Sequence, residues 1–233
     1  MKQNPNFAIT EAVALRLGPL LRELVFVGGC ATGLLITDPA SAPVRVTRDV
    51  DVIAELASYA EYARLSTRLR TLGFREDDAP GAPLCRWVID DMRLDVMPTS
   101  GAVLGFTNRW YAHAIREATE FRLAPHLVIR LVTSPCFLAT KLEAFWTRGR
   151  GDYTSHDFED IVVVIDGRAE LPGEIEASAP EVRRYLTAQF SKLFQDEGFR
   201  ASLPGQFLPD DVSQSRIATV LARIRSIAAY RLQ

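Results

Sequence analysis

The two stretches that decide the fold are Val25-Phe26-Val27-Gly28-Gly29-Cys30-Ala31 and Thr47-Arg48-Asp49-Val50-Asp51-Val52-Ile53. The first is an apolar run that ends in two glycines, which predicts a buried strand over 24–28 and a helix over 30–36 directly after it. The second predicts a strand over 48–54 that carries two aspartates. Because strand side chains alternate between two faces, Asp49 and Asp51 are expected to project from the same face.

The glycine pair and the aspartate pair each indicate a chemistry. Unpaired N–H groups at a helix N-terminus bind phosphate readily, since the helix dipole also favours negative charge there. Two close carboxylates suit a hard cation such as Mg²⁺, which also binds substrate phosphates. Taken alone, a glycine pair is usually a tight turn, and Asp-x-Asp is usually a pair of turn or edge-strand charges. Together they favour a site for phosphate and its metal ion.

Composition excludes several classes of protein. The chain has 233 residues, 48% apolar and 24% charged, which is ordinary for one large globular domain or two small ones. A net charge of −2 gives no global positive field, so a nucleic acid would need a local basic patch. We expect no membrane span, because no apolar run approaches the roughly 20 residues required. The three cysteines, Cys30, Cys85 and Cys136, match no zinc or disulfide pattern, which favours a reducing cytoplasm.

Helices and strands alternate in the rest of the first half. An apolar stripe predicts a helix over 8–23, with Thr10 as its N-cap and a kink at Gly18-Pro19. The other predicted elements are a loop over 37–46, a helix over 57–72 ended by Gly73, a loop over 77–83, a β-hairpin of 84–89 and 92–97 around Asp90-Asp91, and strands over 120–123 and 127–132.

From residue 134 onward the pattern predicts helices only. Ser134 is the expected N-cap of the first, with Pro135 at its N1 position. The run Ser178-Ala179-Pro180-Glu181 has the capping-box pattern and is expected to open the third. The predicted helices cover 134–148, 155–167, 178–197 and 211–230, with a loop over 198–209. The sequence therefore predicts an α/β (α+β) domain over 1–132 and a helical domain over 133–233.

A third acid strengthens the metal-site hypothesis. Asp95 lies among apolar residues on the predicted strand that follows Asp90-Asp91. A carboxylate there is either paired or faces a site, because leaving it unpaired in a core is costly. Three acids on adjacent strands could bind two Mg²⁺ ions, one activating an attacking oxygen and the other neutralising a leaving pyrophosphate. An edge-strand charge is the equally weighted alternative for Asp95.

These residues resemble a known signature. Gly28-Gly29, Asp49-x-Asp51 and Asp95 look like the motif of the nucleotidyltransferase fold shared with DNA polymerase β, a mixed sheet with helices. The run Lys141-Leu142-Glu143-Ala144-Phe145-Trp146-Thr147-Arg148-Gly149, followed by His156-Asp157-Phe158-Glu159-Asp160-Ile161, resembles the AbiEii/AbiGii group. These are nucleotidyltransferase-like toxins of type IV toxin–antitoxin and phage-defence systems, including the mycobacterial MenT toxins. The resemblance covers about residues 25–165.

The resemblance implies an NTP substrate, two Mg²⁺ ions and an acceptor hydroxyl, with RNA such as a tRNA 3′ end favoured, and a cognate antitoxin as partner. The helical part would complete the nucleotide site. The implied roles are metal binding for Asp49, Asp51 and Asp95, triphosphate contact for Gly28, Gly29 and Cys30, phosphate contact for Lys141, and orientation of the site by Asp157 with help from Asp160. Apart from the resemblance, Arg48 is a candidate for substrate contact because it lies next to the Asp-x-Asp pair.

The chain departs from the pattern at two positions, which keeps alternatives open. Cys30 stands where many members carry Ser, so its backbone N–H is expected to contribute more than its thiol. His156 stands where Lys or Arg is usual, and is interpreted as a surface residue. The alternatives are a nucleotide-binding protein without catalysis, a nucleotidyltransferase that acts on a small molecule, and, for Lys141, a merely solvated charge. Trp110 and Tyr111 would either stack on a base with Arg109 or pack in the core.

Overall fold

A computed structural model describes residues 4–230, which divide into two compact units. The sheet unit contains described residues 4–34 and 45–133, and the helical unit contains residues 35–44 and 134–230. The segment 35–44 is thus grouped with residues far later in the sequence. Each unit is described by itself below.

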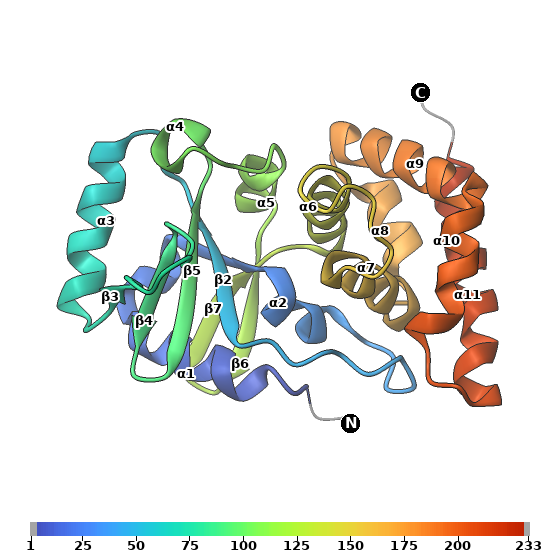
Figure 1. Ribbon diagram of the computed structural model, residues 1–233, viewed down its shortest axis with the longest axis horizontal. Coiled ribbons are helices and arrows are strands. Elements are labelled where there is room, and N and C mark those ends of the chain that lie inside the picture. The colour runs from blue at the N-terminus through green and yellow to red at the C-terminus, as the bar shows by residue number, and fades with distance from the viewer. Residues whose placement is uncertain (1–3, 231–233) are drawn as a thin grey trace. The chain divides into compact units, whose positions relative to one another are not determined.

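The sheet unit is built on seven strands in the order β3-β4-β5-β2-β1-β7-β6 (Figure 1). Strand β1 pairs in parallel with β7 and antiparallel with β2, which in turn pairs in parallel with β5, so the sheet is mixed, as predicted. The strands are β1 (Leu24–Val27), β2 (Asp49–Ala54), β3 (Arg75–Glu76), β4 (Arg86–Ile89), β5 (Met92–Pro98), β6 (Thr119–Ala124) and β7 (Leu127–Leu131).

The middle of this sheet forms the core of the unit. All four residues of β1 are buried, as expected for an apolar strand covered on both faces. The predicted hairpin is confirmed as β4 and β5, in which Ile89 pairs with Met92. The strands predicted over 120–123 and 127–132 are confirmed as β6 and β7, while the two-residue β3 was not predicted.

The helices of the sheet unit are α1 (Phe7–Leu17), the 3-10 helix η1 (Gly18–Arg22), α2 (Gly28–Leu35, whose last residue lies in the helical unit), α3 (Tyr59–Thr71), α4 (Gly101–Leu104) and α5 (Tyr111–Arg116). Three of these helices, α1 to α3, lie near the predicted residues, whereas the short α4 and α5 were not predicted. The expectation that Thr10 is an N-cap is wrong, because α1 begins earlier and the buried Thr10 hydroxyl donates to the Asn6 carbonyl. The disturbance at Gly18-Pro19 is confirmed: the α-helix ends and a 3-10 helix follows.

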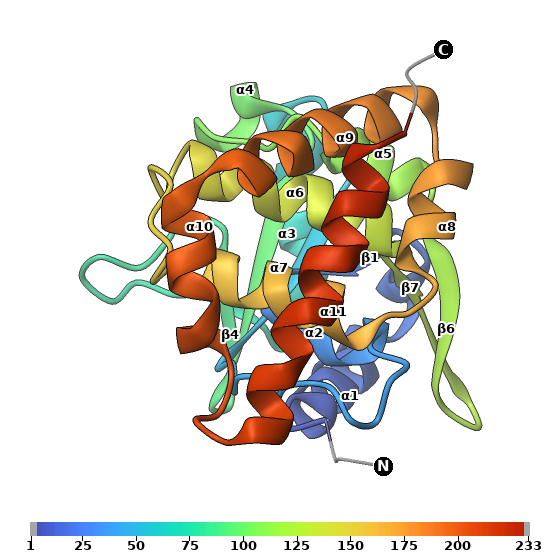
Figure 2. The same ribbon diagram turned by 90° about the vertical axis from the view of Figure 1, so that its right-hand side faces the viewer.

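Between residues 134 and 228 the regular elements of the helical unit are all helices, which confirms the predicted fold class (Figure 2). Its elements are α6 (Ser134–Trp146), α7 (His156–Gly167), α8 (Leu171–Ala177), α9 (Pro180–Gln195), α10 (Glu197–Ser202), the 3-10 helix η2 (Leu203–Gln206) and α11 (Asp211–Ala228). Helix α7 is buried along almost its whole length and packs against α6 and α11. Such a helix is the core of its unit, because apolar residues all around a helix need cover on every side.

Three predictions for the helical unit are wrong at helix ends. Helix α6 begins at Ser134 itself, whose buried hydroxyl has no hydrogen-bond partner and so caps nothing. The Ser178 hydroxyl donates to the Ile175 carbonyl at 2.7 Å and therefore closes α8 instead of opening α9. The predicted loop 198–209 contains most of α10 and all of η2, because Asp196 accepts bonds from the first N–H groups of α10.

The segment 35–44 is hydrogen-bonded to the C-terminal end of α7. The Gly167 carbonyl accepts bonds from the N–H groups of Thr37 and Asp38, each at 2.9 Å. The Ala42 N–H donates to Asp166 Oδ2 at 2.9 Å, and the Arg168 guanidinium donates to the Leu35 carbonyl at 2.6 Å. The Gly167 and Leu35 carbonyls lie at the ends of α7 and α2, where a helix leaves carbonyls unpaired, and these bonds satisfy them. Within residues 4–230, no helix combines the length and the apolar character that crossing a bilayer requires.

Candidate functional site

The start of α2 lies directly against a carboxylate of β2. Gly28 has φ +66°, and a Cβ atom there would lie 1.9 Å from Asp51 Oδ2. Only glycine fits this position, since the backbone is left-handed and the space beside it is taken. The first N–H groups of α2, which have no partner within the helix, are therefore held next to an acid.

A buried asparagine fixes the loop that follows. The Asn6 side chain is fully buried, donates to the Arg45 carbonyl at 2.9 Å and the Gly29 carbonyl at 3.4 Å, and accepts from the Thr47 N–H at 2.9 Å. Arg45 in turn covers Gly29, where an added Cβ would lie 2.5 Å from the guanidinium Nη2. A positive side chain thus lies beside the glycine pair. The sequence did not indicate Asn6, because its partners are 23 to 41 residues away.

The strand register places the three acids in neighbouring positions. Asp51 pairs with Asp95 across β2 and β5, and Asp49 precedes Asp51 by two residues on the same face. Asp95 is buried, whereas the Asp49 side chain is 32% exposed. We call Asp49, Asp51 and Asp95 the acid row.

Arg86 joins two members of the acid row. Its Nε and Nη2 donate to the two carboxylate oxygens of Asp95 at 2.8 and 2.7 Å, and Nη2 also donates to Asp49 Oδ2 at 2.9 Å. The bonds to Asp95 outweigh the opposing effect of burial and raise the pKa of Arg86 further above its ordinary value. Arg86 was not singled out from the sequence. The predicted hairpin contained the signal, because pairing Ile89 with Met92 also pairs Arg86 with Asp95.

The chemistry of the acid row suits a hard divalent cation. Each oxygen of Asp49 and Asp95 accepts one hydrogen bond, from Arg86 or from the Thr47 hydroxyl, and has a second lone pair for a ligand. Carboxylate oxygens are what Mg²⁺ prefers. Within residues 4–230, no group of three or more His, Cys, Asp or Glu side chains is arranged to hold a metal ion. Binding by the whole acid row therefore requires side-chain movement, including a change in the Arg86 contacts.

Two other predicted site residues lie in the same unit. The Cys30 thiol is buried and donates to the Val27 carbonyl at 3.0 Å, so it points back to the strand that precedes it. Arg48 is exposed just before β2. Burial of Trp110 confirms the core-packing interpretation for this residue, and Arg109 stacks over its ring with 5.3 Å to the centroid.

The helical unit holds the other predicted site residues in one buried ionic cluster. Lys141 Nζ on α6 lies 3.0 Å from Asp157 Oδ1 and 2.7 Å from Asp160 Oδ2, both on α7. Arg148 Nη2 lies 2.8 Å from Asp157 Oδ2. Lys141 is only 8% exposed, so its interpretation as a solvated charge is wrong. His156, by contrast, is exposed, as expected for a surface residue.

The cluster lowers the pKa of Asp157. Burial acts to raise the pKa of Asp157, but the charge of Lys141 and the hydrogen bond from Arg148 outweigh it, and the pKa lies below the ordinary value. Asp157 and Asp160 are three residues apart on α7 and so face Lys141 together. The contact of Lys141 with the acids of the later motif is therefore a tight ionic pairing within this unit, which the sequence did not indicate.

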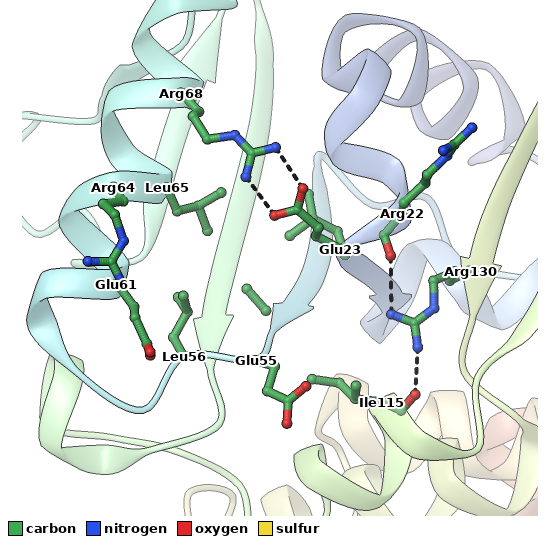
Figure 3. Close-up of a pocket in the computed structure, with 12 residues that line it drawn as sticks. Arg22, Glu23, Glu55, Leu56, Glu61, Arg64, Leu65, Arg68, Ile115 and Arg130 are labelled. Carbon is green, nitrogen blue, oxygen red and sulfur yellow. Dashed lines mark hydrogen bonds and ion pairs between the residues drawn. The ribbon is translucent and has the colours of Figure 1, made fainter.

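A pocket of about 470 Å³ lies elsewhere in the sheet unit (Figure 3). It is lined by Leu24 and Ala54, which lie at the ends of β1 and β2 opposite to Gly28 and Asp49. Its charges are largely satisfied within the protein: Arg68 donates twice to Glu23, and Arg130 donates to backbone carbonyls. The candidate site is the acid row with the glycine pair, not this pocket.

No protein-family model matches the sequence, and no curated protein matches it either. Among solved structures, the chain is similar to an antigenic nucleotidyltransferase-like protein from Paracoccidioides brasiliensis, with 17% identity, 93% of this chain and 94% of that chain covered, and a TM-score of 0.47. It is also similar to a provisionally assigned nucleotidyltransferase from H. pylori, with 11% identity, 98% and 96% coverage, and a TM-score of 0.47. A likeness this distant carries no argument about activity, which rests on the residues.

Proposed function

We propose that this protein is a metal-dependent nucleotidyltransferase that moves a nucleoside monophosphate from an NTP to an acceptor hydroxyl. The observation that carries the proposal is the contact of the Gly28 backbone with the Asp51 carboxylate. This contact places the N-terminus of α2, which suits phosphate, next to the acid row, which suits the metal ion bound to that phosphate. A metal–triphosphate substrate requires both at one place.

The residues of the sheet unit have distinct roles in this proposal. Asp49, Asp51 and Asp95 would hold two Mg²⁺ ions, which neutralise triphosphate charge and favour an ionised acceptor oxygen. The N–H groups of Gly29 and Cys30 bind phosphate oxygens, and Arg45 beside Gly29 adds positive charge. Asn6 keeps this loop in place through its three backbone contacts. Arg48, exposed before β2, contacts the substrate.

The helical unit contributes the Lys141 cluster. We propose that Lys141, oriented by Asp157 and Asp160, binds nucleotide phosphate as a compact positive charge. This assignment follows the resemblance to the AbiEii/AbiGii group. The same resemblance supports an RNA acceptor such as a tRNA 3′ end and a toxin role with a cognate antitoxin. The cysteine pattern supports a cytoplasmic location.

The test is transfer of label from each of the four NTPs, labelled at the α-phosphate, to total cellular RNA with Mg²⁺. We expect Asp49→Asn, Asp51→Asn and Asp95→Asn each to reduce labelling by on the order of 10²–10³-fold, since each removes charge at the reacting phosphate. Asp91→Asn is the matched control, because Asp91 is an exposed acid of the hairpin turn. Labelling that survives both Asp49→Asn and Asp51→Asn contradicts the assignment of the metal site.

One observation favours a second candidate, a nucleotide-binding protein without catalysis. Position 30 carries a thiol in place of a hydroxyl, and this thiol donates to the Val27 carbonyl and so is not directed at a phosphate. Calorimetry that detects Mg²⁺–NTP binding, together with no product on RNA, would favour this candidate. Labelling of a small hydroxyl compound in place of RNA would instead support a small-molecule acceptor, with which the net charge of −2 agrees.

A further inference from the structure

Arg86 is a cation in contact with two members of the acid row, Asp49 and Asp95. Its guanidinium makes a two-point contact with Asp95 and a single contact with Asp49, and the side chain is only 15% exposed. Two-point guanidinium–carboxylate pairing fixes orientation as well as distance. Arg86 therefore sets where Asp95 points.

The three contacts differ in strength. Both oxygens of Asp95 are held, by separate nitrogens of Arg86. Asp49 receives one bond, from the Nη2 that also serves Asp95 Oδ2. The Thr47 hydroxyl holds the other oxygen of Asp49 at 2.6 Å, so Asp49 keeps an anchor when Arg86 withdraws. Of the three contacts, the single hydrogen bond to Asp49 requires the least free energy to replace with a contact to a metal ion.

We propose that Arg86 is a positioning residue that serves as the internal counter-ion of the acid row, and that a divalent cation displaces it from Asp49 on binding. This inference rests on the proposed function, which assigns metal binding to the same acids. Arg86 keeps Asp95 oriented throughout, and gives up Asp49 Oδ2 to the metal. The positive charge of Arg86 repels the incoming cation and so lowers the affinity of the site for metal. When no metal is bound, the same charge keeps the acids in place.

The effect of the Arg86 charge on metal affinity has a lower bound. A unit charge within a few ångströms of a divalent ion, at the effective dielectric constant of a protein surface, changes affinity by at least about tenfold. Removing the charge of Arg86 is therefore expected to tighten metal binding. It is also expected to lower the rate of transfer, because Asp95 loses its two-point support.

The experiment measures Mn²⁺ binding to the full chain by loss of the free Mn²⁺ electron paramagnetic resonance signal. We expect Arg86→Met to bind Mn²⁺ at least about tenfold more tightly than wild type. Arg93→Met is the matched control, because Arg93 lies on β5 beside Asp49 in register and is exposed to solvent. Its loss is expected to leave the Kd within about twofold, since exposed charges are screened.

A second measurement separates this role from simple structural support. The melting temperature of Arg86→Met should be lower than that of wild type in EDTA, and should rise more on adding Mn²⁺. If Arg86→Met does not fold, Arg86→Gln is the deciding variant, since it also removes the charge but can still donate to Asp95.

The outcomes are distinguishable. In one outcome, wild type binds Mn²⁺ and Asp51→Asn abolishes this binding, but the neutral Arg86 variant binds Mn²⁺ equally or more weakly than wild type. This result overturns the counter-ion role and leaves the proposed function intact. Absence of Mn²⁺ binding in wild type and every variant overturns the metal site, and the inference with it. Tighter binding in both Arg86→Met and Arg93→Met also overturns it, because a general change of charge then explains the effect.

Discussion

Gly28 carries a hydrogen atom where any other residue would carry a carbon, and the Asp51 carboxylate fills the space beyond it. This single position lets the start of α2 touch the acid row. The sequence predicted that the glycine pair and the aspartate pair share one site, but it did not indicate the direct contact of Gly28 with Asp51. Their contact depends on β1 pairing with β2 so that Val27 faces Asp51.

Gly28→Ala is predicted to displace Asp51 and abolish nucleotidyl transfer. A left-handed backbone costs alanine about 1–2 kcal/mol, and the clash adds about 1–3 kcal/mol. Gly105→Ala is the control, because Gly105 has φ +81° and open space where its Cβ would lie. The free energy of unfolding from urea titration and the labelling rate are the measurements. Equal losses in the two variants would contradict a specific role for the Asp51 contact.

Lys141→Met is predicted to destabilise the protein as well as to affect activity. The change leaves two buried aspartates without their shared lysine, and breaking such a buried pair costs about 3–5 kcal/mol. Urea titration measures the loss. Arg184→Met, which removes an exposed charge from α9, should change stability by less than about 0.5 kcal/mol. A stable Lys141→Met protein would show that the cluster does little for folding.

Residue types at the candidate site could be predicted, but their partners could not. The pattern of acids on the predicted strands singled out the acid row, and the resemblance to the AbiEii/AbiGii group singled out Lys141, Asp157 and Asp160. Arg86 was missed because a charged residue on a hairpin looks solvated in sequence. Asn6 was missed because it acts only through backbone groups that folding brings to it.

At the scale of elements, long periodic segments were predicted well and helix ends poorly. The hairpin, α3 and α7 follow from alternation, caps and apolar runs. The short helices α4, α5 and α8 do not, because a helix of one or two turns is stabilised by packing rather than by its own pattern. Ser178 shows why caps mislead: the same hydroxyl can close the helix before it or open the one after it.

Arg216→Met is predicted to loosen the C-terminal end of α7. Arg216 on α11 donates to both oxygens of the fully buried Asp166 at 2.7 and 2.9 Å, and to Asp38 at 2.6 Å. Its loss leaves a buried carboxylate without its cation, which costs about 3–5 kcal/mol. Hydrogen exchange should report faster opening at Thr37 and Asp38. Arg225→Met on the same helix loses only a ring contact with Phe194 and should cost less than about 1 kcal/mol.

For the molecule as a whole, stability is predicted to fall in acid. The folded-state pKa of Asp157 lies below the ordinary 3.8, so its contribution is complete at pH values above that number and is lost as the pH falls through the folded pKa. The free energy of unfolding should be flat near neutral pH and decline below about pH 4. Asp157→Asn should decline less steeply over this range. A wild-type protein that gained stability on acidification would contradict the sign of this shift.

The bonds between the segment 35–44 and the end of α7 can form only late in synthesis of the chain. Ala42 and its partner Asp166 are 124 residues apart, and Leu35 and Arg168 are 133 apart. At common rates of translation, about 6 to 27 s pass between the emergence of the two sides. Every strand of the sheet unit has left the ribosome by then, while this segment still has no partner. A nascent chain that ends after β7 therefore carries a complete set of strands and one unanchored loop, and a protease added at that stage should cut first between α2 and β2.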